Sequence, residues 1–187
     1  MAPTRWTTPG VNLRRVLCVG SWNVLSLSED HRLPHLSDEL SRLRVDMVGL
    51  SGSGETNSKG FTYYWSGMSN IHHVKRVAIG ISSRLKTSVV EVTQVDERIM
   101  RLRLKHSLGF MSVVTVYAPT EVCETEEKMF YAKLDFVLDQ CPRCDALIVL
   151  GDINAVTGTE RAGYEICVGP YGCGPRNDKS FFLLKFV

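Results

Sequence analysis

The feature that most limits the fold of this chain is a series of short apolar segments between residues 61 and 117. Five segments follow one another with turn-rich or charged breaks between them: FTYYW, VAIGIS, SVVEVT, IMRLRLK and FMSVVTVY. They are rich in β-branched and aromatic residues, and such closely spaced segments indicate strands that pair with antiparallel neighbours. So many consecutive strands argue against a helical bundle and against strict alternation of strand and helix.

Helices are predicted on either side of this series, at residues 33–45 and 124–140. The first places Leu36, Leu40 and Leu43 at i, i+4 and i+7, the stripe of an amphipathic helix. The second keeps the same period and begins with acidic residues, which suit the positive end of a helix dipole. Further strands, the last two of them buried, are predicted in RRVLCVGSWN, VDMVGL and DALIVLGD, and a last helix in SFFLLKFV, capped by an Asn or Asp. We therefore expect an α/β domain with mostly antiparallel sheet covered by helices.

The composition is that of one ordinary folded domain. The 187 residues are 44% hydrophobic and 22% charged, and the net charge of +2 neither requires nor excludes a nucleic-acid partner. Residues 1–13 lack the apolar core of a signal peptide, and no apolar run approaches the roughly 20 residues of a membrane span. We expect an intracellular chain that is not secreted and not membrane-bound, with residues 1–13 as a flexible lead-in and the six cysteines reduced.

Polar side chains stand at or just beyond the ends of four predicted strands. Because the ends of neighbouring strands converge in a layered α/β domain, these side chains could share one cleft. They are Asn23, Ser51, Glu55, Tyr117, Asp152 and Asn154.

Each candidate also has a simpler structural explanation. Asp152 and Asn154 can form a turn, because Asp and Asn bond their own backbone and often follow strands. Asn23 can cap a strand end, Tyr117 can be a half-buried aromatic residue, and Glu55 can be a solvated carboxylate in a Gly- and Ser-rich loop. A D-x-N calcium loop is excluded, since its fifth position would hold a valine.

Taken together, the motifs resemble a known family. The order of WN, VDMVGLS, VYAPT and IVLGDINA is similar to that of the endonuclease/exonuclease/phosphatase superfamily. It most resembles the endonuclease domains of RTE-type non-LTR retrotransposons and the craniofacial development protein 2-like proteins. The resemblance runs from about Val16 to the end. It implies one domain over residues 1–187, a four-layer sandwich of two packed, mostly antiparallel sheets flanked by helices.

The resemblance also implies a mechanism on DNA and, with it, residence in the nucleus. One Mg²⁺ or Mn²⁺ ion would stabilise the leaving oxygen of a cleaved phosphodiester. Asp152 would orient or deprotonate the attacking water and help hold the metal. Asn154 would hydrogen-bond the scissile phosphate, Tyr117 would donate its hydroxyl to it, and Asn23 would hold the metal or its waters.

The chain departs from the family pattern at two important places. The metal-binding Glu expected after VGLS is missing, and Glu55, three residues beyond Gly52, is only a tentative substitute. The sequence ends at Val187, before the Asp-His pair of the family, and no other histidine can replace it. We therefore expect a truncated copy without its C-terminal strands, marginal in stability, in which hydrolysis is impaired or lost.

Two alternatives remain open for the function. One is a catalytically inactive remnant that acts as a nucleic-acid or protein interaction module. The other keeps the fold and changes the substrate to a phosphoinositide or another phosphate ester. Protein partners and oligomeric state are left open by the sequence.

Two weaker patterns allow more than one interpretation. The strand IMRLRLK has a basic face that could follow a phosphate backbone or could simply be solvated. Cys141 and Cys144 form a C-x-x-C pair that could be a dithiol, or could bind zinc with Cys167 and Cys173, although the spacing is unusual for zinc.

Overall fold

The computed structural model describes residues 16–24, 32–51, 57–66, 76–120 and 123–187. These residues fall into two compact units. The first consists of the chain up to Val116 together with Cys141–Gly151, and the second of Tyr117–Gln140 together with Asp152–Val187.

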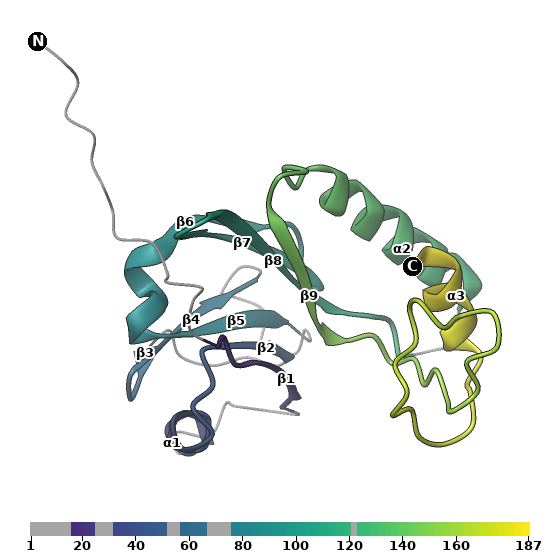
Figure 1. The fold of residues 1–187 in the computed structure, drawn as a ribbon, viewed down its shortest axis with the longest axis horizontal. Coiled ribbons are helices and arrows are strands. Elements are labelled where there is room, and N and C mark those ends of the chain that lie inside the picture. The colour runs from purple at the N-terminus through teal and green to yellow at the C-terminus, as the bar shows by residue number, and fades with distance from the viewer. Residues whose placement is uncertain (1–15, 25–31, 52–56, 67–75, 121–122) are drawn as a thin grey trace, which may run out of the picture. The chain divides into compact units, whose positions relative to one another are not determined.

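The first unit is built on two β-sheets, with helix α1 (Arg32–Arg42) on the outer face of one of them (Figure 1). The five-stranded sheet has the order β1-β2-β5-β4-β3, and the four-stranded sheet the order β6-β7-β8-β9. In chain order the strands are β1 (Val19–Asn23), β2 (Met47–Ser51), β3 (Asn57–Ser58), β4 (Phe61–Trp65), β5 (Val77–Ser82), β6 (Val89–Gln94), β7 (Ile99–His106), β8 (Gly109–Tyr117) and β9 (Ala146–Asp152). Every strand expected from the sequence is present, and the short β3 and the 3₁₀ helix η1 (Ser83–Ser88) are additional.

Both sheets are mixed. Strands β2, β5 and β4 pair antiparallel, as do β6, β7 and β8, whereas β1 and β2 are parallel and joined by α1. Strands β8 and β9 also run in the same direction. Ser112, early in β8, donates to Asp145 just before β9, and at the other end the N–H of Ala118 donates to the carbonyl of Asp152. The expected mostly antiparallel α/β sandwich is confirmed.

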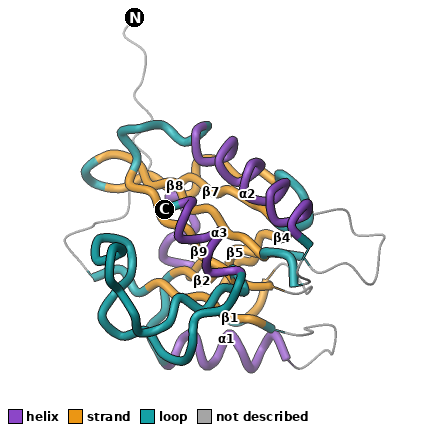
Figure 2. The backbone as a smooth tube through the Cα atoms, turned by 90° about the vertical axis from the view of Figure 1, so that its right-hand side faces the viewer, coloured by secondary structure: helices purple, strands orange, loops and turns teal. Residues whose placement is uncertain are grey.

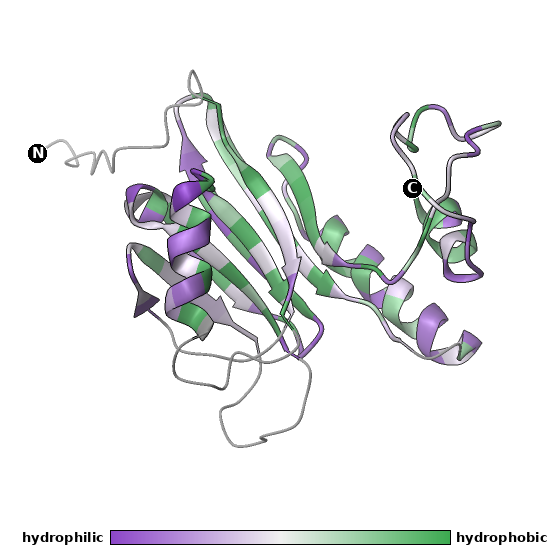
Figure 3. Ribbon diagram, turned by 90° about the horizontal axis from the view of Figure 1, so that it is seen from below, coloured by the Kyte–Doolittle hydropathy of each residue, from purple (hydrophilic) through white to green (hydrophobic). Residues whose placement is uncertain are grey.

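Helix α1 packs on the five-stranded sheet through one apolar face. Leu33, Leu36 and Leu40 are buried against a cluster that includes Val48 and Tyr63. Figure 2 shows the helix along the outside of this sheet, and its outer side is hydrophilic in Figure 3. The i, i+3, i+7 spacing is an amphipathic helix pattern, as expected, but it begins at Leu33, one turn before the predicted start at Leu36.

The prediction for Leu43 was wrong. The helix ends at Arg42, and the chain then reverses through Arg44, whose φ is 55°. Leu43 is consequently 48% exposed.

The two sheets approach each other most closely at Gly49 in β2. A Cβ atom at this position would lie 2.8 Å from the Cβ of Leu150 and 2.9 Å from the hydroxyl of Thr115, both in the opposite sheet. Real side chains essentially never come so close. A glycine is therefore required here for β8 and β9 to pack against β2 at this distance.

Strand β9 was predicted to be buried, but part of it is exposed. It lies at the edge of the four-stranded sheet, and Leu147 and Val149 are 46% and 38% exposed. An unbroken apolar run normally indicates a central parallel strand covered on both faces. Burial depends on what covers a strand, which the apolar run does not specify.

The second unit is organised around helices α2 (Glu124–Asp139) and α3 (Lys179–Phe186). The ring of Tyr131 in α2 lies 6.3 Å from Phe182 and 5.3 Å from Phe186 in α3, between ring centroids. At the start of α3, Lys179 forms a buried ion pair with Glu127 at 3.1 Å and donates to the carbonyl of Pro119. The two helices are thus joined by aromatic packing and one buried charge pair.

The C-terminal helix expected from SFFLLKFV is present, and its cap is Asn177. The Oδ1 atom of Asn177 accepts the N–H of Ser180 at 3.1 Å. Asp178, the other candidate, makes no side-chain cap. No helix within the described residues is long and apolar enough to cross a membrane.

The register of α1 can be tested with a matched pair of truncations. Leu40→Ala removes a side chain that is 1% exposed and should lower the free energy of unfolding by about 2–5 kcal/mol. Leu43→Ala, at an exposed position, should change it by less than about 0.5 kcal/mol. Urea unfolding followed by circular dichroism measures both, and equal losses would contradict this register.

Candidate nucleic-acid phosphodiester site

The ends of β1 and β2 bring two predicted site residues together. The strands are parallel, and Asn23 lies directly opposite Ser51. The Ser51 hydroxyl donates to the Asn23 carboxamide oxygen at 2.9 Å, and the N–H of Val24 donates to the Ser51 carbonyl at 3.1 Å. The side chain of Asn23 is thereby held in a defined orientation at an exposed strand end.

Gly151, the last residue before Asp152, can only be a glycine. Its φ is +123°, and a Cβ atom there would lie 1.9 Å from the carbonyl oxygen of Val116 in β8. Its N–H donates to the hydroxyl of Ser21 in β1 at 2.8 Å. Without a side chain the end of β9 can lie directly against the backbone of β8.

Asp152 and Asn154 form a tight turn beyond this glycine. The Oδ1 atom of Asp152 accepts the N–H of Asn154 at 2.9 Å, and Asn154 adopts a φ of 55°, which asparagine tolerates better than most residues. The Asn154 amide nitrogen donates to the carbonyl of Ala118 at 2.9 Å, and the Ala118 N–H donates to the carbonyl of Asp152 at 2.9 Å. The simpler explanation, a turn, is therefore correct as a description of local structure.

This turn also joins two of the sequence motifs. Ala118 follows Tyr117 in VYAPT, and both of its backbone groups bond to the LGDIN segment. Tyr117 itself is only 4% exposed, less than a half-buried aromatic residue would be. The structure thus brings together Tyr117, Asp152 and Asn154 through the backbone bonds of Ala118.

The remaining parts of the predicted site are not brought together in the same way. Asn23 belongs to the first unit, whereas Tyr117, Asp152 and Asn154 belong to the second, so one shared cleft stays a prediction. Glu55 lies outside the described residues.

A metal site was also tested against the side chains present. Carboxylate and carboxamide oxygens are suitable ligands for Mg²⁺ or Mn²⁺. Within the described part of the chain, however, no three His, Cys, Asp or Glu side chains are grouped so as to hold an ion. The described carboxylates, histidines and cysteines therefore do not form a metal site by themselves.

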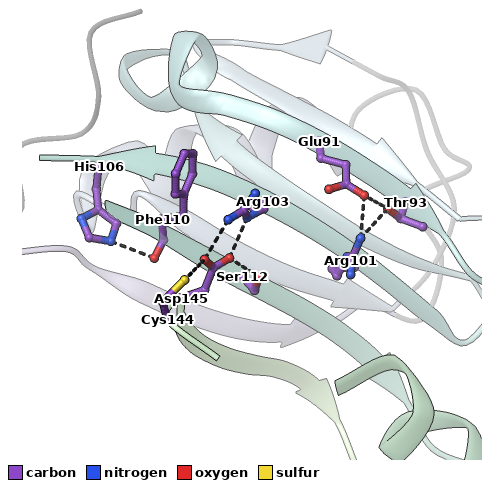
Figure 4. A network of polar contacts seen from close by, with 9 residues as sticks. All are labelled: Glu91, Thr93, Arg101, Arg103, His106, Phe110, Ser112, Cys144 and Asp145. Carbon is purple, nitrogen blue, oxygen red and sulfur yellow. Dashed lines mark hydrogen bonds and ion pairs between the residues drawn. The ribbon is translucent and has the colours of Figure 1, made fainter. Parts of the chain in front are cut away.

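The two arginines on the basic face of β7 are paired with carboxylates (Figure 4). Arg103 binds Asp145 through two hydrogen bonds of 2.7 and 2.9 Å, and Ser112 donates to the same carboxylate at 2.8 Å. Arg101 contacts Glu91 at 2.5 Å. Arg103 and Asp145 lie 42 residues apart in the chain, so the strand pattern alone gives no sign of this pairing.

The environment of Asp145 favours its ionised form. Its side chain is 1% exposed. The hydrogen bonds from Arg103 are the main reason that the pKa of its carboxyl group is lowered, and the bond from Ser112 adds to this, while burial alone would raise the pKa. The Arg103 guanidinium also stacks 4.1 Å above the ring of Phe110. This network holds the start of β9 to strands β7 and β8.

The cysteines are not grouped as the zinc site that was one interpretation of C-x-x-C. All six are free thiols, with Cys141 buried and Cys144, Cys167 and Cys173 exposed. None of them takes part in a group of metal ligands among the described residues.

Comparison with known proteins identifies relatives of limited coverage. No model of a known protein family matches the sequence. Craniofacial development protein 2 of Bos taurus and of Tragulus javanicus are each 29% identical over 175 residues, which is 90% of this chain. The match covers 29% and 30% of those proteins, so the chain spans less than a third of their length.

Solved structures share the fold at low sequence identity. The endonuclease domain of TRAS1, a telomere-specific non-LTR retrotransposon, superposes with a TM-score of 0.62 at 12% identity, over 90% of this chain and 69% of that one. A protein from Leptotrichia buccalis C-1013-b has a TM-score of 0.58 at 14% identity, and the match covers 80% of this chain and 72% of that one. TDP2 from Caenorhabditis elegans has a TM-score of 0.54 at 14% identity, and the match covers 74% of this chain and 47% of that one.

The paired arginines of β7 predict a specific pH dependence. Folding lowers the pKa of Asp145. The ionised carboxylate therefore contributes fully to folding stability above its unfolded pKa of about 3.9, and this contribution is lost as the pH falls through the lower pKa of the folded state. Arg103→Gln should cost about 2–3 kcal/mol at pH 7, since it leaves a buried carboxylate without its cation.

Arg101→Gln provides the control, because its partner Glu91 is 46% exposed and such pairs contribute about 1 kcal/mol or less. Denaturant unfolding at pH 7 and at pH 3 measures both variants. The difference in the free energy of unfolding between Arg103→Gln and the unmodified protein should be smaller at pH 3 than at pH 7. An equal difference at both pH values would contradict the role of Asp145.

Proposed function

We infer that this chain, which has the fold of the endonuclease/exonuclease/phosphatase superfamily, derives from nucleic-acid phosphodiesterases. We propose that it is a DNA endonuclease-like domain of retrotransposon origin in which hydrolysis is impaired or lost. The observation that carries the proposal is the turn at Asp152 and Asn154, held at the end of β8 by the backbone of Ala118. The turn joins the segment that carries Asp152 and Asn154 to the residue that follows Tyr117, in the order of the family motifs.

The chemistry of this turn suits a phosphodiester substrate. A carboxylate can orient a water molecule and accept its proton. The Asn154 amide uses one hydrogen on the Ala118 carbonyl and has a second that can bond a phosphate oxygen. The carboxylate and the amide are each held by a hydrogen bond to the backbone before any substrate binds. Groups fixed in this way stabilise a transition state most effectively.

The proposed hydrolysis includes a divalent metal ion. Mg²⁺ or Mn²⁺ is proposed as the cofactor from the resemblance alone, with Asn23 and Asp152 as ligands and Glu55 as a tentative third. The described residues show no acidic cluster around Asp152. Loss of one transition-state stabiliser commonly lowers the rate about 10²- to 10³-fold, which is why we propose impaired hydrolysis.

A non-catalytic role is the second candidate. The same absence of an acidic cluster in the described residues favours a domain that binds DNA without cleaving it. The two proposals differ in whether phosphodiester bonds are broken, so a single assay separates them.

The test is nicking of supercoiled plasmid in Mg²⁺ or Mn²⁺. Asp152→Asn is the preferred variant, because its amide oxygen can still accept the Asn154 N–H and preserve the turn while the base is removed. We expect a slow nicking rate that falls about 10²-fold or more in Asp152→Asn. Asp178→Ala, at an exposed aspartate of the same unit without a capping bond, should nick as the unmodified protein does.

The result also decides between the two candidates. Equal background nicking by the unmodified protein and Asp152→Asn would refute hydrolysis through this site. If both proteins then shift the plasmid in a gel without cutting it, the non-catalytic DNA-binding role stands.

A further inference from the structure

The first unit contains a cavity of ≈ 620 Å³ to which the proposed phosphodiester chemistry assigns no role. It lies where β1 and β2 begin and β5 ends, at the opposite end of β1 and β2 from Asn23 and Ser51. This volume is within the range of about 300–1,000 Å³ that is typical of small-molecule sites. The cavity is therefore large enough for an organic ligand.

The walls of the cavity are held by hydrogen bonds between separate segments of the chain. The carboxylate of Asp46 accepts the N–H of Cys18 at 2.9 Å, and the Asp46 carbonyl accepts the N–H of Ser82 at 2.9 Å. The N–H of Ser83 bonds the carbonyl of Gly60 at 2.7 Å. The cavity is a formed part of the fold, which lowers the cost of ordering groups around a ligand.

Two arginines and one aspartate give the cavity its charge. Asp46 is 4% exposed and forms an ion pair with Arg84, so these two charges offset each other. Arg44 also lines the cavity, and its guanidinium has no hydrogen bond or ion pair with any residue that the structure describes. The lining therefore carries one uncompensated positive charge.

The backbone of Arg44 strengthens the case that this charge has a role. Arg44 follows α1 with a φ of 55°, and the N–H of Val45 bonds back to the carbonyl of Leu40 at 2.8 Å. Glycine is the usual residue at such a helix end, because left-handed backbone is unfavourable for a side chain. Backbone strain that persists beside a cavity is one reason to consider a binding role for the residue that carries it.

The other lining groups complement an anion with an organic part. The hydroxyls of Ser41 and Ser83 line the cavity and can donate to oxygens, while Phe61 provides apolar surface. A guanidinium presents a planar fork of donors that matches a phosphate or a carboxylate.

We propose that this cavity binds a small phosphomonoester, with the Arg44 guanidinium and the serine hydroxyls on the phosphate and the organic group against Phe61. A phosphomonoester is favoured because the planar fork of Arg44 and separate hydroxyl donors can bond several of its oxygens at once. The site is distinct from the Asp152 turn and does not depend on nuclease activity.

Binding is tested by calorimetric titration with adenosine 5′-monophosphate at constant ionic strength, without divalent metal or DNA. We expect saturable binding of this probe, competition by inorganic phosphate, and no competition by acetate. Adenosine should not bind measurably, since it lacks the phosphate. Adenosine binding as tightly as the monophosphate, or the absence of saturable heat, would overturn the proposal.

Arg44→Gly separates a binding role from a structural one. It should weaken binding of adenosine 5′-monophosphate about 10-fold or more, because a charge-assisted contact is lost. It should also raise the melting temperature of the free protein, since glycine relieves the left-handed strain. Arg42→Ala, two residues earlier and paired with Glu39 at 2.8 Å, is the matched control and should bind as the unmodified protein does. Unchanged affinity in Arg44→Gly would disprove the assignment.

Discussion

The contact between Gly151 and the backbone of Val116 is the constraint on which the candidate site depends. Because no side chain separates them, β9 ends against β8. Just beyond this contact the N–H of Ala118 donates to the carbonyl of Asp152 and continues the pairing. The turn of Asp152 and Asn154 then follows from a backbone already held in place. A substituted Gly151 would displace the carboxylate before altering any chemistry, so the glycine of LGD acts as a positioning residue.

Most of the fold could be predicted from the sequence because the strands are short, apolar and closely spaced. The errors arose where burial depends on distant partners. Leu43 has the right spacing, but the helix ends before it, and the apolar run of β9 gives no sign that the strand lies at an edge. Periodicity reports which residues could face a core, and the position of an element in its layer decides which of them do.

The local part of the candidate site could also be predicted from the sequence, whereas the part that needs distant segments could not. Short motifs identified Tyr117, Asp152 and Asn154, because their geometry is made locally by one turn and one neighbouring strand end. A metal site requires ligands from several separated segments, so no local motif can specify it. The turn and the functional explanation of Asp152 were treated as alternatives in the sequence, whereas in the structure the turn is what orients the carboxylate.

The arginines show why charge in a sequence does not by itself indicate a ligand. Arg103 lies on an alternating basic strand, the usual pattern of a phosphate track, yet a carboxylate 42 residues away occupies its guanidinium. Arg44 belongs to no basic pattern, and it lacks such a partner within the described residues while lining a cavity. A desolvated anion can be bound only by donors that are not already satisfied, because breaking an internal ion pair would offset the new contact. Unsatisfied charge in a formed cavity is consequently the better guide to an anion site, and only the folded structure reveals it.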